Sequence, residues 1–89
     1  MKRVHIFIYG HVIGVFFRDE IKELALKLKI KGWVRNTLDG KVEAVFEGDE
    51  RDIEKMVEFC NKGSLRSKVD KVEIKEEDVQ FEKDFNIKW

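Results

Sequence analysis

Six glycines divide this chain into short segments whose apolar residues repeat with different periods, and no proline interrupts the pattern. In some segments the apolar side chains alternate, as on a strand with one buried face. In others they recur every third or fourth residue, as on an amphipathic helix. The glycines, at positions 10, 14, 32, 40, 48 and 63, fall between these segments. A chain of 89 residues punctuated in this way predicts one domain, residues 1–89, built of short strands and helices.

Five segments with alternating apolar residues predict β-strands. The first places Val4, Ile6 and Ile8 on one face, with His5, Phe7 and Tyr9 on the other. The third follows Asp39-Gly40, which predicts a hairpin turn because both residues can adopt positive φ. The predicted strands cover residues 3–9, 33–38, 41–47, 68–75 and 81–88.

Two further segments have helical spacing. The first runs from Arg18 to Lys31, and Gly32 stands where its end is expected. The second follows Asp49, a suitable N-cap, and ends at Gly63. The order of elements is therefore β-α-β-β-α-β plus a fifth strand. This order predicts an α+β, ferredoxin-like split βαβ sandwich, with two helices on one face of a mostly antiparallel sheet.

The composition argues against several classes of protein. The formal net charge is zero, whereas a generic nucleic-acid binder carries a basic face, so we expect no nucleic-acid partner. A single cysteine, Cys60, allows no intrachain disulfide and no cysteine-rich metal site. No apolar run approaches the 18 residues of a membrane span, and no signal-peptide core is evident. We therefore expect a cytoplasmic protein with no membrane partner. We also expect a monomer, although the composition does not determine the oligomeric state.

The segment GHVIGVFFR, residues 10–18, separates the first predicted strand from the first helix. A glycine-containing loop between a strand and a helix directs backbone N–H groups toward one point near the positive end of the helix, which makes an anion cradle. The segment lacks the Gly-Lys-Ser/Thr ending of a nucleotide P-loop and the dinucleotide G-x-G-x-x-G pattern. Arg18 closes the cradle, and its guanidinium can bind two phosphate oxygens at once.

The chain resembles the acylphosphatase family in three motifs. Gly10 to Arg18 reads Gly-x-Val-x-Gly-Val-x-Phe-Arg, Gly32 to Asn36 reads Gly-Trp-Val-Arg-Asn, and Asp39 to Glu43 reads Asp-Gly-x-Val-Glu. The resemblance covers essentially the whole chain. It implies a hydrolase acting on acid anhydrides that cleaves the carboxyl–phosphate bond of small-molecule acyl phosphates. It also implies that no metal or other cofactor is needed, and that inorganic phosphate is both product and competitive ligand.

The resemblance also assigns roles to residues. The family's catalytic arginine falls on Arg18 and its catalytic asparagine on Asn36. Two positions depart from the family pattern: Ile13 replaces the usual Gln, and Ser64 replaces the usual Pro. Since main-chain amides bind the phosphate in this family, the change at Ile13 should be tolerated. The implied phosphate-binding loop consists of Ile13, Gly14, Val15, Phe16, Phe17 and Arg18.

Two polar side chains and a set of loop amides are sufficient for hydrolysis of an acyl phosphate. The leaving group is a carboxylate, whose conjugate acid has a pKa of about 4, so a general acid adds little. Phosphoryl transfer passes through a loose transition state in which positioning and charge stabilisation dominate. Arg18 and the loop amides would neutralise the transferring group, and Asn36 would hold water in line with the scissile bond.

Two other functions stay open at this point. The chain could be an acylphosphatase-like phosphate-binding or regulatory domain with little turnover. It could also be an RNA-binding module that stacks bases on Phe7 and Tyr9. Residues 41–48, KVEAVFEG, lack the Lys/Arg-Gly-Phe/Tyr pattern that such a module carries.

Several conspicuous residues are predicted to be structural. His5 and His11 are expected to face solvent, because no carboxylate partner is evident for a metal site. Cys60 is expected in the core of the second helix, and at least one of Phe16 and Phe17 should pack there too. Trp33 is expected to be structural. The acidic run Glu76-Glu77-Asp78 is expected to form a solvated loop.

Overall fold

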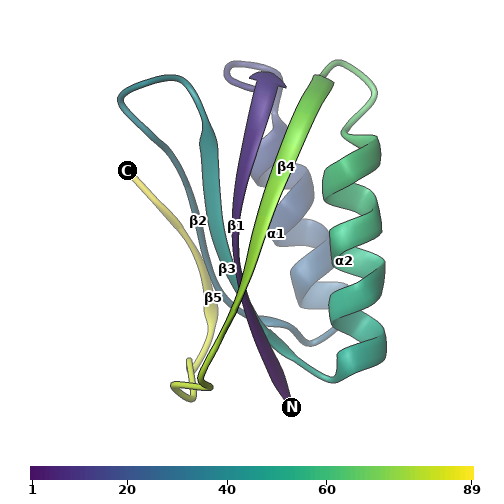
Figure 1. The fold of residues 1–89 in the computed structure, drawn as a ribbon, viewed down its shortest axis with the longest axis vertical. Helices are drawn as coiled ribbons and strands as arrows, with labels where there is room; N and C mark the ends of the chain where they lie inside the picture. The colour runs from purple at the N-terminus through teal and green to yellow at the C-terminus, as the bar shows by residue number, and fades with distance from the viewer.

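Two helices, α1 (Phe17–Lys27) and α2 (Glu50–Lys62), lie on the same face of a five-stranded sheet (Figure 1). The computed structural model describes all of residues 1–89 and confirms the predicted α+β, ferredoxin-like architecture. Both helices fall short of the length and apolarity needed to cross a membrane. The strands are β1 (Lys2–His11), β2 (Lys31–Asn36), β3 (Val42–Gly48), β4 (Lys68–Glu77) and β5 (Phe85–Lys88).

The strands are arranged in the order β4-β1-β3-β2-β5, and all neighbours are antiparallel except β2 and β5. Because β1 and β2 both pair antiparallel with β3, they run parallel to each other on either side of it. Val42 lies opposite Ile8 of β1 and opposite Asn36 of β2. The carboxyl ends of β1 and β2 therefore lie at the same end of the sheet, on either side of β3.

The core fills the space between the sheet and the helices. Val4, Ile6 and Ile8 face inward, as the alternation predicted, and each such side chain contributes about 1.5–3 kcal/mol on burial. His5, Phe7 and Tyr9 lie on the opposite, half-buried face. The helices and the remaining strands contribute Phe17, Ile21, Ala25, Val34, Ala44, Phe46, Ile53, Met56, Cys60 and Phe85 to the same cluster.

The predicted end of the first helix was wrong. Helix α1 ends at Lys27 rather than Lys31, and Lys29 turns the chain at a φ of 57°. Gly32 lies inside β2 at a φ of 137°, where a Cβ atom would be 1.9 Å from the backbone oxygen of Val45. Glycine is required here because β2 and β3 approach closely, and a local helix-stop rule does not detect such a contact.

The boundaries of the last two strands also differ from the prediction. Strand β4 extends to Glu77, so Glu76 and Glu77 are not in a loop. Strand β5 begins at Phe85 instead of residue 81, and Phe81 is 76% exposed at a φ of 59°. The physical reason is topological: β4 and β5 are opposite edges of the sheet, so residues 78–84 must connect them.

A buried carboxylate holds this connection. Glu47 of β3 is 1% exposed and accepts hydrogen bonds from the backbone N–H groups of Gln80 (2.6 Å) and Glu82 (2.7 Å). It also pairs with the Arg3 guanidinium at 3.0 Å. Burial by itself would raise the pKa of Glu47, but the two backbone donors and Arg3 outweigh it and lower that pKa below its ordinary value.

His5 is also part of a charged network, contrary to the predicted solvent exposure. Its side chain is 24% exposed, and its ring nitrogens contact Glu43 Oε2 at 2.6 Å and Glu77 Oε2 at 2.9 Å. The hydrogen bond from His5, followed by that from Arg3, lowers the pKa of Glu77. The two carboxylates come from β3 and β4, so only the strand pairing brings them to His5.

The close approach at Gly32 predicts a large loss of stability on substitution. Gly32→Ala should lower the free energy of unfolding by about 4 kcal/mol or more, because the new Cβ overlaps a backbone oxygen that cannot move freely. Gly40→Ala is the matched control: its φ is 85°, but no atom lies within 4 Å of the new Cβ. The control should cost about 1–2 kcal/mol in urea denaturation, and equal losses in the two variants would contradict this account.

The charge on Glu47 predicts a specific acid dependence. A carboxyl group with a lowered pKa stabilises the fold above its ordinary value of 4.5, and this contribution is lost as pH falls through its folded-state pKa. Glu47→Gln should therefore lower the free energy of unfolding at pH 7 by about 3 kcal/mol and flatten its decline below pH 4.5. The exposed Glu58→Gln on α2 should keep the wild-type pH profile. An unchanged profile in Glu47→Gln would refute the assignment.

Candidate active site

The site is built on the loop that connects β1 to α1. Val12, Val15 and Phe17 are buried and anchor this loop in the core. Between these anchors the backbone adopts positive φ at Gly14 (72°) and at Phe16 (61°). Phe16 is 66% exposed, so its left-handed conformation is not explained by packing of its ring. Backbone strain of this kind costs about 1–3 kcal/mol and is concentrated at functional sites.

The backbone N–H groups of residues 13–19 donate no hydrogen bond within the protein. None of these N–H groups donates to a backbone carbonyl in a turn, loop or cap. None donates to a side chain either. Glu20 N is the first donor of the helix to find a partner, Phe16 O at 3.1 Å. The loop donors and the first turn of α1 thus form a cluster suited to binding an anion.

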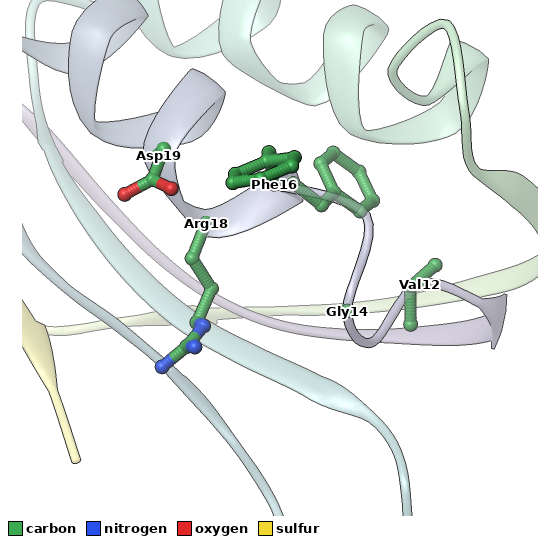
Figure 2. Close-up of a pocket in the computed structure, with 6 residues that line it drawn as sticks. Val12, Gly14, Phe16, Arg18 and Asp19 are labelled. Carbon is green, nitrogen blue, oxygen red and sulfur yellow. The ribbon is translucent and has the colours of Figure 1, made fainter.

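Arg18 lies beside a hollow of about 260 Å³ at this loop (Figure 2). The Arg18 and Asp19 side chains project to different sides of the start of α1 (Figure 2). Arg18 takes part in none of the ion pairs of the protein, so its guanidinium keeps its charge and its donors. The hollow is lined by Val12, Gly14, Phe16, Phe17, Arg18 and Asp19.

Asn36 is the last residue of β2, at the end of the sheet where β1 also ends. Its side-chain oxygen, Oδ1, is buried and has no hydrogen-bond partner. Leaving a buried acceptor unpaired costs about 1–3 kcal/mol, and native proteins contain few such atoms. The residue as a whole is only half-buried, so a turn of the amide would bring this acceptor within reach of a water molecule.

The structure brings together four of the six predicted loop residues. Gly14, Phe16, Phe17 and Arg18 line the hollow, whereas Val15 packs into the core and Ile13 is exposed. Asn36 does not line the hollow and lies at the neighbouring strand end. Sequence reasoning did not single out three residues that contribute to the site. These are Val12 and Asp19, which line the hollow, and Trp89, whose ring lies 4.6 Å from Arg18 Cζ.

The predictions for Cys60, Phe17 and His11 are confirmed. Cys60 is buried, and burial raises the pKa of its thiol to about 12, so it is not a nucleophile. Phe17 packs edge-on against Phe59 in the core. His11 is exposed, and Trp33 is half-buried beside the ring of His5.

Comparison with known proteins identifies the family. The acylphosphatase family profile matches residues 4–87. The acylphosphatase of Haloarcula marismortui is 47% identical over 98% of this chain and 96% of that protein. The chain belongs to the acylphosphatase family. The acylphosphatase of Syntrophobacter fumaroxidans is 53% identical over 91% of this chain and 84% of its own.

The acylphosphatase fold is shared as well. The crystal structure of acylphosphatase from Bacillus subtilis superposes with a TM-score of 0.96 at 36% identity, covering all of both chains. Family membership and this likeness support an enzymatic function, and the chain hydrolyses the carboxyl–phosphate bond of acyl phosphates.

The two departures from the acylphosphatase pattern have different surroundings. Ile13 is exposed beside a loop whose donors are backbone groups, so its side chain is not needed to form the cradle. Ser64 is buried, and its N–H donates to Ser67 Oγ at 2.7 Å. Proline has no N–H and could not make this bond, so here a hydrogen bond takes the place of a rigid ring.

Proposed function

We propose that residues 13–18 hold the transferring phosphoryl group and that Asn36 holds the water that attacks it. The observation that carries this proposal is the run of unpaired backbone N–H groups at residues 13–19, which includes Arg18. Most of these donors belong to residues that line one hollow, which the permanently charged Arg18 also lines, and such donors match the oxygens of a phosphate group. Positive charge is unfavourable at a helix N-terminus, so α1 itself does not favour Arg18 at this position, whereas a bound anion would.

The reaction follows from this arrangement. The backbone donors and Arg18 neutralise the phosphoryl oxygens, and Asn36 Oδ1 accepts a hydrogen bond from water and orients it. The water oxygen forms a bond to phosphorus while the bond from phosphorus to the acyl oxygen breaks. The bonding electrons leave with the carboxylate, and the protons of the water stay with the phosphate or pass to solvent. No general acid is required, because a carboxylate is a good leaving group.

The same proposal covers what the site binds and needs. Its substrate is a small-molecule acyl phosphate, inorganic phosphate competes for the loop, and no metal or other cofactor takes part. Residues 1–89 act as one domain and as a monomer. The hollow, Arg18 and Asn36 all come from this chain, so the proposed site needs no residue from a second copy.

Steady-state hydrolysis of benzoyl phosphate in the presence of a chelator tests the two side chains. Arg18→Ala should lower kcat/KM by roughly 10²–10³-fold, the effect of losing a preorganised donor to the transition state. Asn36→Ala should act mainly on kcat, by about 10²-fold, because it misplaces the nucleophile without touching the phosphate. Inorganic phosphate should inhibit the wild type competitively.

Matched controls separate these roles from general damage. Arg66→Ala and Asn61→Ala remove exposed residues of the same types far from β1–α1 in sequence, and both should retain wild-type kinetics. A folded wild type that binds phosphate without turnover would point to a phosphate-binding or regulatory domain. Full kcat in Asn36→Ala would disprove the role of Asn36 in holding water.

A further inference from the structure

The guanidinium of Arg18 has one notable neighbour, the indole ring of Trp89. The Arg18 Cζ atom lies 4.6 Å from the centre of this ring. Arg18 makes no ion pair, and none of the side-chain hydrogen bonds involves it. Without the ring, the long side chain would be free to adopt several rotamers, and ordering it on phosphate binding would cost free energy.

The sheet places Trp89 where this contact can form. Phe85 is buried and Ile87 packs against the core, so alternation continued one residue past β5 directs Trp89 to the side of the sheet that carries α1, where its ring stays exposed. Lys88 pairs with Arg35 in the parallel register of β5 and β2. Trp89 follows directly after β5, so it lies toward the end of the sheet where β2 ends at Asn36.

We propose that Trp89 is a positioning residue that holds the Arg18 guanidinium toward the phosphate loop. This inference rests on the proposed role of Arg18 in binding phosphate. An aromatic ring attracts the guanidinium through its π face and leaves the N–H donors in the guanidinium plane free. A carboxylate partner would occupy those donors and cancel the charge, so it would compete with phosphate. Trp89 orders Arg18 without either penalty.

The expected effect is modest and measurable. An exposed cation–π contact corresponds to about a two- to fivefold change in an equilibrium constant. Trp89→Leu should therefore weaken inorganic phosphate binding about two- to fivefold, and Trp89→Phe should restore part of the loss. KM for benzoyl phosphate should rise by the same factor. Because Trp89 is 96% exposed, neither substitution should unfold the protein.

A double-mutant cycle tests whether Trp89 acts through Arg18. Phosphate affinity is measured by direct titration of the wild type, Trp89→Leu, Arg18→Ala and the double variant. The proposal predicts that Trp89→Leu has no further effect once Arg18 is absent. Phe81→Leu, a change at an exposed aromatic residue between β4 and β5, should leave phosphate affinity unchanged.

The results that would reject the positioning role of Trp89 differ from those that would reject the proposed function. Equal losses from Trp89→Leu with and without Arg18 would overturn the positioning role, as would an affinity unchanged in Trp89→Leu. Phosphate titration requires no turnover, so the cycle gives its answer even in a protein that does not hydrolyse acyl phosphates. Failure of Arg18→Ala to weaken phosphate binding would instead reject the underlying role of Arg18.

Discussion

The unpaired backbone N–H groups between β1 and α1 are the feature on which the rest of the site depends. Backbone donors without partners are costly unless water or a ligand satisfies them. Val12, Val15 and Phe17 are buried in the core, and they hold the loop backbone in a conformation that forms no hydrogen-bonded turn. The left-handed backbone at Phe16 belongs to the same arrangement. The buried side chains of the loop thus fix its backbone in a conformation that leaves these N–H groups unpaired. In this way a small fold can preorganise an anion site.

The sheet determines which residues surround those donors. Because β1 and β2 run parallel on either side of β3, Asn36 is placed at the same end of the sheet as the loop between β1 and α1. The close contact of β2 with β3 depends on Gly32, and the place of β5 beside β2 depends on a connection that Glu47 secures. Substitutions at these distant positions are therefore expected to disturb Asn36 and the neighbouring Trp89, even though Gly32 and Glu47 do not line the hollow.

Local patterns in the sequence predicted the elements and the glycine-containing loop between β1 and α1, but contacts between distant strands were not predictable from them. The alternation of Val4, Ile6 and Ile8 identifies the inner face of β1 without any tertiary information. Gly32 was misread as a helix stop, because its role is set by the backbone of β3. His5 was expected in solvent, because its carboxylate partners lie far away in sequence. Trp89 was missed for the same reason, since its contact with Arg18 exists only when β5 lies along β2.

This small enzyme relies on positioning and charge. In the proposed mechanism Arg18 and the loop amides bind the phosphoryl group, and the water near Asn36 attacks phosphorus rather than the carbonyl carbon. Hydrolysis of benzoyl phosphate in ¹⁸O-labelled water tests this claim most directly, because the label marks the atom that was attacked. The account predicts that the heavy oxygen appears in inorganic phosphate and not in benzoate. Label in the benzoate would show attack at carbon, and it would contradict the proposed placement of substrate and water.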